Sequence, residues 1–226
     1  MLPLPYSVED AVVHLSQADE RMAALIHAVG PHHSELKASG HPFEALSESI
    51  VYQQLSGKAA GTIWGRFRAL LGHNGPLNPA KVLELDPDVM RGAGLSRAKT
   101  RAIRDLAEKT VDGLIPDRHE LQEWEDEIII ERLTSVQGIG PWTVKMYLMS
   151  RLGRPDVLPH TDLGIRKGVQ RMDGMSELPA PKEVIERAAP WRPYRTLASW
   201  YLWRCLDLED DSIPPFSSLI SPRSAR

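Results

Sequence analysis

The 226-residue sequence lacks several features that mark particular protein classes. Its single cysteine excludes a disulfide framework or a four-cysteine iron–sulfur site, and it favours a reducing compartment. No apolar run approaches the roughly 18 residues that a membrane-spanning helix needs. The first residues, MLPLPYSVED, have neither the basic flank nor the apolar stretch of a signal peptide. We therefore expect a cytoplasmic protein with no membrane partner.

A zinc site is also not expected. Four histidines surround one loop, at positions 27, 32, 33 and 41, but no cysteine or carboxylate frames them at ligand spacing.

Positive charge is scarce overall, because the formal net charge is −3. The distribution is uneven, however. Acidic residues dominate 1–50 and 120–131, whereas basic residues gather in 97–104, 151–171 and 187–204. This segregation allows one face of an acidic molecule to contact phosphates. Each basic cluster has an alternative reading as an ordinary solvated surface.

Helical periodicity is what the sequence does contain. Apolar residues recur at three- and four-residue spacing through 43–71 and 195–206, and 8–29 predicts one long amphipathic helix or two short ones. Ser96 predicts the start of a further helix over 97–111, which either packs against its neighbours or contacts phosphate. No segment shows the alternation of a strand. The sequence therefore predicts an all-α fold.

A tight turn lies at the centre of this pattern, with the sequence Val136-Gln137-Gly138-Ile139-Gly140-Pro141. Its glycines are too dense for a helix interior, and the proline fits the first position of a new helix. Helical spacing on both sides predicts a helix, a hairpin and a second helix. The backbone N–H groups that open the second helix can bind an anion, and Ile139 would anchor the hairpin in the core. The alternative is an ordinary glycine turn.

An aspartate follows this hairpin, in the segment His160-Thr161-Asp162-Leu163-Gly164. A glycine-rich hairpin followed by a loop aspartate resembles the helix-hairpin-helix superfamily of DNA glycosylases. Within that superfamily the sequence is most similar to the alkylation-repair branch, 3-methyladenine DNA glycosylase II. The resemblance covers about residues 43 to 204.

The resemblance implies two packed helical lobes with a DNA-binding cleft and a helix-hairpin-helix motif. We expect residues 1–206 to form this unit, with one lobe of roughly 43–133 and the other of 1–42 with 134–206. Residues 207–226 are rich in serine and proline and predict a mobile tail.

Asp162 is the catalytic candidate. Cleaving the bond between a base and deoxyribose builds positive charge on the sugar, which a carboxylate can stabilise while it orients water. Its alternative role is to cap the helix that begins at Leu163, and the two roles are compatible.

Position 142 distinguishes two reaction types. Bifunctional members of the superfamily carry a nucleophilic lysine two residues beyond the second hairpin glycine. This chain has Trp142 there, and we assign no such role to Lys145. The resemblance therefore implies a monofunctional hydrolase that leaves an abasic site in base excision repair.

The resemblance also implies how a flipped base is held. Aromatic rings grip alkylated purines, whose positive charge adds a cation–π attraction. The expected pocket residues are Trp142, Trp203, Tyr194, Met146 and Leu163, with Trp191 as the alternative to Tyr194. Met146 and Leu163 stand where relatives can carry aromatic residues, so this pocket should be less aromatic and more adaptable.

Further residues are expected to contact DNA. Gln54 or Leu55 should fill the gap that a flipped nucleotide leaves, although Leu55 can instead belong to the core. The complete set of expected DNA contacts comprises Gln54, Leu55, Ser56, Gly138, Ile139, Gly140 and Thr143.

No cofactor is expected beyond a monovalent cation that the hairpin can bind through the backbone carbonyls of Thr134, Val136 and Ile139. The expected partner is double-stranded DNA with damaged bases, and the expected setting is a monomer acting at the nucleoid of a bacterial cell. Two alternatives remain open: a DNA-binding module without catalysis, and a bifunctional glycosylase/lyase.

Overall fold

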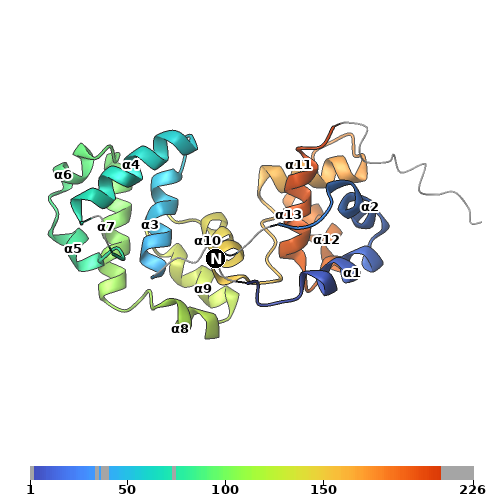
Figure 1. Cartoon of the computed structure of the whole chain (residues 1–226), viewed down its shortest axis with the longest axis horizontal. Coiled ribbons are helices and arrows are strands. Elements are labelled where there is room, and N and C mark those ends of the chain that lie inside the picture. The colour runs from blue at the N-terminus through green and yellow to red at the C-terminus, as the bar shows by residue number, and fades with distance from the viewer. Residues whose placement is uncertain (1–2, 34–35, 37–40, 73–74, 210–226) are drawn as a thin grey trace, which may run out of the picture. The chain divides into compact units, whose positions relative to one another are not determined.

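The computed structural model describes residues 3–33, 36, 41–72 and 75–209. Among these residues the regular secondary structure is helical and contains no β-strand, which confirms the all-α prediction (Figure 1). No helix of the described ranges has both the length and the apolarity to cross a bilayer. The predicted tail lies outside them from residue 210 onward.

Thirteen α-helices, one π-helical segment (η1) and one 3-10 turn (η2) occur in the described part of the chain. Their bounds are α1 Val8–Ala18, α2 Glu20–Val29, α3 Pro42–Tyr52, α4 Gly57–Leu70, α5 Pro79–Glu84, α6 Pro87–Gly92, α7 Arg97–Val111, α8 Arg118–Glu123, α9 Asp126–Thr134, α10 Pro141–Tyr147, η1 Leu148–Leu152, α11 Leu163–Asp173, α12 Pro181–Arg187, η2 Ala189–Trp191 and α13 Arg195–Cys205.

The chain divides into two compact units, which we call the terminal unit (Met1–Leu36 with Gly153–Arg226) and the central unit (Lys37–Leu152). The discontinuous division matches the expectation, but the boundaries differ. The hairpin and α10 belong to the central unit, not with the chain ends, because α10 packs against α9 and α3.

Capping explains why the helices begin where they do. The Ser96 hydroxyl accepts a hydrogen bond from the Lys99 N–H and starts α7 at the predicted residue. The first N–H groups of α2 are capped by Asp19, whose extended backbone (φ −155°) interrupts the apolar pattern of 8–29. Two short helices form there instead of one long one.

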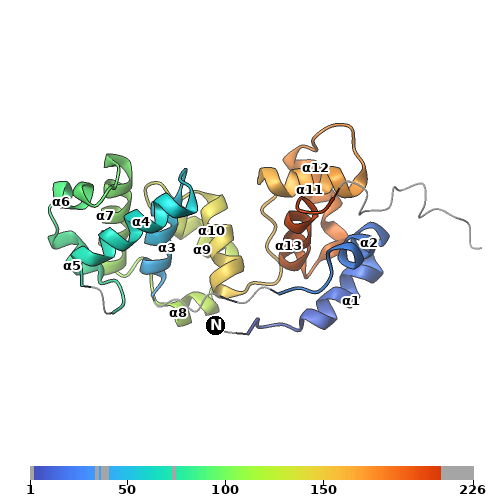
Figure 2. The same ribbon diagram turned by 45° about the horizontal axis from the view of Figure 1, so that its top comes forward.

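The core of the terminal unit surrounds α13, which packs against α11 and α2 (Figure 2). Gly168 makes close packing possible, because a Cβ at this position would lie 2.5 Å from the carbonyl oxygen of Leu202. The buried thiol of Cys205 contacts the Gly168 carbonyl oxygen at 3.9 Å. Burial raises the pKa of this thiol to about 11.

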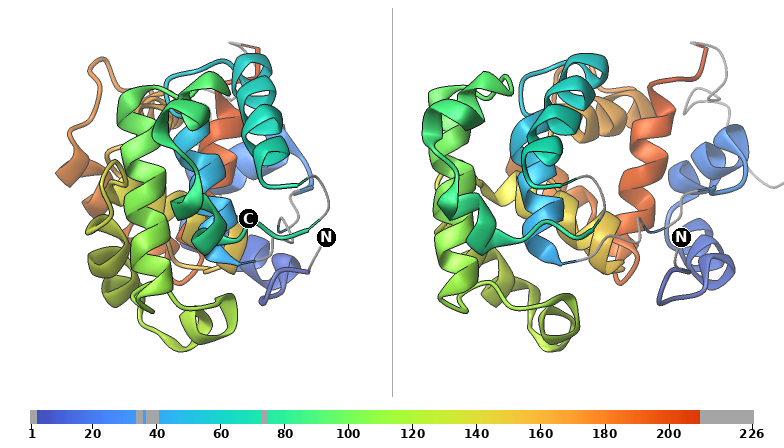
Figure 3. Two further views of the ribbon diagram at one scale, coloured as in Figure 1. Left: turned by 90° about the vertical axis from the view of Figure 1, so that its left-hand side faces the viewer. Right: turned by 60° about the vertical axis from the view of Figure 1, so that its left-hand side comes forward.

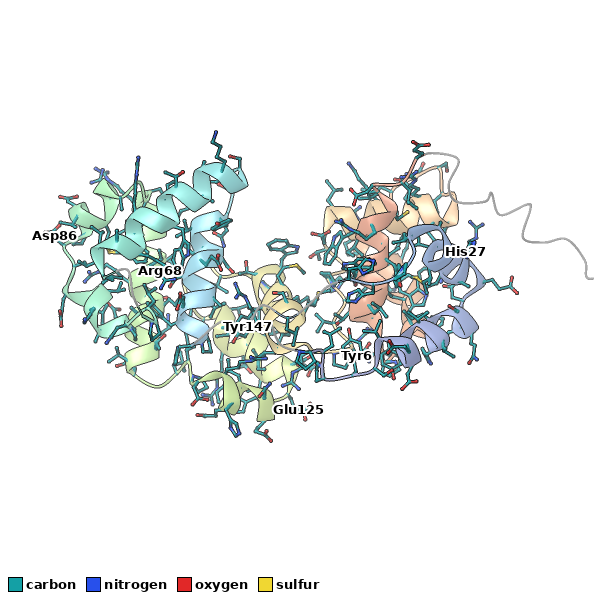
Figure 4. All side chains as sticks on the ribbon, viewed as in Figure 1. Tyr6, His27, Arg68, Asp86, Glu125 and Tyr147 are labelled. Carbon is teal, nitrogen blue, oxygen red and sulfur yellow. The ribbon has the colours of Figure 1, made fainter. Side chains whose placement is uncertain are left out.

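The central unit has its own core around α7, which packs against α3 and α5 (Figure 3). Phe43 and Ile50 of α3 and Ile103 and Leu106 of α7 are fully buried or nearly so. Tyr147 ends α10 in the same unit (Figure 4). Its burial raises the pKa of the Tyr147 hydroxyl far above the ordinary value.

Candidate active site

Asp162 caps the N-terminus of α11, as its alternative role required. Its Oδ1 atom accepts a hydrogen bond from the Ile165 N–H at 2.9 Å. The same oxygen accepts a second bond from the Trp203 indole Nε1–H at 3.0 Å. A backbone group and a side chain of another helix therefore fix the orientation of this half-buried carboxylate.

Gly164 lets the indole approach this carboxylate. A Cβ at position 164 would lie 2.8 Å from Cδ1 of Trp203 and 3.0 Å from Oδ1 of Asp162. Such distances are shorter than van der Waals contact, so a larger residue would displace the ring. The glycine two residues after the aspartate is thus part of the same arrangement, a role that local spacing does not reveal.

The other predicted pocket residues of the terminal unit have different surroundings. Leu163 is 52% exposed, and the Tyr194 ring packs against the rings of Tyr6 and His14 at centroid distances of 5.9 Å and 5.4 Å. Tyr6 precedes α1 (Figure 4), and burial followed by repulsion from Tyr194 raises its pKa to about 12.

The hairpin has the predicted geometry. Gly138 adopts φ +79°, a conformation that glycine tolerates and that L side chains rarely adopt. Ile139 is 96% buried, so it anchors the hairpin as expected, and Pro141 opens α10. The N-cap of α10 is Gly140, which has no side chain to satisfy the first N–H groups.

The three carbonyls predicted to bind a cation belong to this hairpin. The Val136 oxygen accepts a hydrogen bond from the Ile139 N–H at 3.1 Å, and a carbonyl oxygen has a second lone pair for another partner. The described residues contain no group of three or more histidine, cysteine, aspartate or glutamate side chains placed to bind a metal.

A pocket of about 530 Å³ lies in the central unit, and the structure brings several predicted residues together around it. Its lining comprises Ser49, Tyr52, Gln53, Gln54, Trp142, Thr143 and Met146. Trp142 is 46% exposed, so its ring is accessible from solvent at this pocket. Tyr52 and Ser49 were not predicted, because their apolar neighbours made them indistinguishable from the rest of α3.

The turn after α3 carries the predicted gap-filling residues. Gln54 has φ +58° and is the one residue other than glycine with positive φ in the described ranges. Leu55 is 40% exposed and therefore does not belong to the core. Ser56 caps α4, because its hydroxyl accepts a hydrogen bond from the Ala59 N–H at 3.4 Å.

Several residues of the basic clusters have structural partners within the protein. Arg104 donates to the carbonyl oxygens of Leu83 and Leu85, which end α5. Arg195 forms an ion pair with Asp156 at 2.6 Å. Arg171 likewise donates to three carbonyl oxygens, one on the last residue of α13 and two on the residues after it. The clusters consequently offer fewer side chains to DNA phosphates than the sequence suggested.

Comparison with known proteins agrees with this geometry. The family model for the HhH-GPD superfamily of base excision DNA repair proteins matches residues 48–193. DNA-3-methyladenine glycosylase 1 of Schizosaccharomyces pombe is 36% identical over 211 residues, which are 92% of each chain. The putative DNA-3-methyladenine glycosylase YfjP of Bacillus subtilis is 31% identical over 73% of this chain and 59% of its own.

Solved structures give the same result. The S. pombe 3-methyladenine DNA glycosylase in complex with abasic DNA matches with a TM-score of 0.79 and 35% identity, covering 89% of this chain and 98% of its own. A DNA-3-methyladenine glycosidase of Bacillus halodurans matches with a TM-score of 0.82 and 34% identity, covering 96% and 97%. The chain therefore belongs to the HhH-GPD superfamily of base excision DNA repair proteins.

Proposed function

We propose that the protein is a monofunctional DNA glycosylase that excises alkylated bases of the 3-methyladenine type and leaves an abasic site. The observation that carries this proposal is the Asp162 carboxylate, oriented by the Ile165 N–H and the Trp203 indole. The family and the names of the relatives support the substrate class.

The chemistry follows from the charge that the reaction develops. As the N-glycosidic bond breaks, the sugar becomes oxocarbenium-like, and a fixed carboxylate stabilises that cation without reorganising. Asp162 also orients the attacking water. An alkylated purine carries a positive charge before cleavage and leaves as a neutral base, so the reaction needs neither a general acid nor a cofactor.

The residue two positions after Gly140 supports hydrolysis over a lyase reaction. A Schiff-base mechanism requires an amine at that position, and Trp142 has none. Its exposed ring instead lines the pocket of the central unit with Met146. Trp142, Met146, Trp203, Tyr194 and Leu163 are the proposed contacts of the flipped base.

The proposed DNA contacts are of two kinds. The hairpin residues Gly138, Ile139 and Gly140, with Thr143, offer backbone N–H groups and the positive end of the α10 dipole to a phosphate. A monovalent cation on the carbonyls of Thr134, Val136 and Ile139 would strengthen this contact.

The second kind of contact fills the space of the extruded nucleotide. Gln54, Leu55 and Ser56 supply it from the turn after α3 and the start of α4. We further propose that the protein acts as a monomer in the cytoplasm, on double-stranded DNA.

Base release tests the proposal. Duplexes that each contain one lesion (3-methyladenine, 7-methylguanine, ethenoadenine or hypoxanthine) are incubated with enzyme, and the free base is quantified by chromatography. Asp162→Asn should lower the single-turnover rate at least about 100-fold, which is the loss expected for a group that stabilises transition-state charge. Asparagine is an equally good helix cap, so the variant should stay folded.

The two alternatives predict different outcomes. A non-catalytic binding module would release no base from any duplex, and Asp162→Asn would change nothing. A bifunctional enzyme would form a covalent adduct with DNA in the presence of borohydride, whereas we expect none.

A further inference from the structure

One face of α7 contacts two segments of the central unit that are proposed to bind DNA. Lys99, Ala102, Asp105 and Lys109 are spaced by three or four residues, so they form one stripe on this helix. The stripe meets the end of α3 and its following turn at Lys99, and the hairpin at the other three residues.

The contact with the α3 turn is polar and partly buried. The Lys99 ammonium donates to the carbonyl oxygens of Val51 and Gln53, both at 2.8 Å. The last carbonyls of a helix lack intrahelical partners, and a cation there also interacts favourably with the helix dipole. Partial burial lowers the pKa of the Lys99 ammonium.

This contact bears directly on the residue with positive φ. The left-handed conformation of Gln54 is unfavourable for a residue other than glycine, so the surroundings must hold it. Lys99 binds the carbonyl of the preceding residue, Gln53. It thereby fixes the peptide from which Gln54 and Leu55 project.

The contact with the hairpin uses the rest of the stripe. Asp105 Oδ2 accepts a hydrogen bond from the Gln137 N–H at 2.7 Å, and Lys109 donates to the Ser135 carbonyl at 2.9 Å. A Cβ on Gly138 would lie 3.2 Å from the Cβ of Ala102, so the hairpin backbone rests on the helix surface.

A third contact joins the two segments to each other. The Gln53 side-chain amide donates to the Gly138 carbonyl oxygen at 3.0 Å. Helix α7, the turn 53–55 and the hairpin 135–138 are therefore linked pairwise, and such a triangle resists relative motion of any two of its members.

We propose that α7 is a positioning helix that sets the separation between the hairpin and the turn 53–55, with Lys99 as the positioning residue of the turn. The inference rests on the proposed function. Its consequence is that binding energy from the phosphate contact of the hairpin is converted into extrusion of a nucleotide, because the gap-filling side chains cannot yield when the duplex pushes against them.

The test compares Lys99→Met with Lys81→Met, which removes one positive charge from an exposed site in the same unit. Extrusion is followed by the fluorescence of 2-aminopurine beside an abasic-site analogue in a duplex, and binding is followed by anisotropy of the same duplex. Lys99→Met should keep its binding within about threefold and lose about tenfold in the extrusion equilibrium. Lys81→Met should match wild type in both measurements.

A double-mutant cycle shows whether Lys99 acts through the turn. If it does, Lys99→Met has no further effect on extrusion once Gln54 and Leu55 are both alanine. An equal tenfold loss in both backgrounds, or a loss of binding as large as the loss of extrusion, would overturn the inference. Should Lys99→Met fail to fold, Gln53→Leu removes the link to Gly138 and enters the same cycle.

The cycle does not depend on catalysis. Wild type that extrudes 2-aminopurine but releases no damaged base would contradict the proposed function and leave the positioning role of α7 intact. Normal base release, together with an equal effect of Lys99→Met in both backgrounds of the cycle, would support the proposed function and contradict the positioning role of α7.

Discussion

Asp19 and Asp162 show how one local motif can have two uses within the terminal unit. Each aspartate caps a helix, and each also accepts a hydrogen bond from an indole N–H, of Trp191 and Trp203 respectively. The environments differ. The Asp19 side chain is only 7% exposed and Trp191 is fully buried, whereas Asp162 and Trp203 are half-buried.

The partners of Asp19 explain its role. Its Oδ1 caps α2, while its Oδ2 accepts bonds from Trp191 and from the Arg187 guanidinium, which also pairs with Asp173 at 2.7 Å. Burial alone would raise the pKa of the Asp19 carboxyl, but the hydrogen bonds from Arg187 and Trp191 hold it below its ordinary value. This cluster joins α2 to α11, α12 and η2, and it therefore stabilises the unit. Both aspartates have the same kind of cap and the same kind of indole donor. Burial and the ion pair with Arg187 therefore give Asp19 a structural role, and the more exposed position of Asp162 suits its proposed catalytic role.

The largest effects on stability and on rate should come from two single variants, Asp19→Asn and Asp162→Asn. Asp19→Asn should lower the free energy of unfolding by about 3 kcal/mol, because it removes one of the two carboxylates that pair with the partly buried Arg187 and leaves only Asp173. Urea denaturation measures this loss. The rate of base release per folded molecule should stay at the wild-type value, in contrast to Asp162→Asn.

The next largest effect distinguishes the roles of two glycines of α11, one in stability and one in the reaction rate. Gly168→Ala should destabilise the protein by about 2 kcal/mol, because the new methyl group would overlap the backbone of Leu202. Gly164→Ala meets movable side chains instead, so its cost should appear mainly as a slower reaction. In thermal unfolding Gly168→Ala should be the more affected variant, and in single-turnover base release Gly164→Ala should be the more affected one. If the same variant were the more affected in both measurements, the role assigned to Gly164 would be contradicted.

Replacing the two indoles sharpens the comparison further. Trp203→Phe keeps an aromatic ring but removes the donor to Asp162, and we expect about a tenfold lower single-turnover rate. Trp191→Phe should leave the rate of base release per folded molecule unchanged and lower the free energy of unfolding instead, because Trp191 is buried and donates to Asp19.

The smallest effect concerns pH and stability. The pKa of Asp19 is lower in the folded state than its ordinary value of 3.8, so its contribution to stability is present above that value and is lost as pH falls through the folded-state pKa. The free energy of unfolding should therefore fall more steeply between pH 4 and about pH 2 in wild type than in Asp19→Asn. Parallel slopes would show that the Asp19 cluster does not carry the charge interaction assigned to it.

The sequence predicted those features that depend on neighbouring residues. Ser96 and the proline at position 141 mark helix starts at the observed residues, and the glycines of 136–141 form the expected hairpin. Family resemblance added Asp162, since a capping aspartate alone would have described Asp19 equally well.

What escaped prediction depends on distant parts of the chain. The indole of Trp203 reaches Asp162 across 41 positions, and Lys99 reaches Gln53 across 46. Neither pairing produces a periodic pattern in the sequence from which it could be predicted. The unit boundaries were misplaced for the same reason, because the packing of α10 on α3 cannot be read from local spacing.

Cys205 has a consequence for an enzyme that meets alkylating chemicals. Cysteine reacts with methylating agents in its thiolate form. The sole sulfhydryl of this chain is fully buried, and burial raises its pKa to about 11. At neutral pH it is protonated and out of reach of reagents in solution. The protein is thereby protected at its most nucleophilic side chain from the same agents that create its proposed substrates.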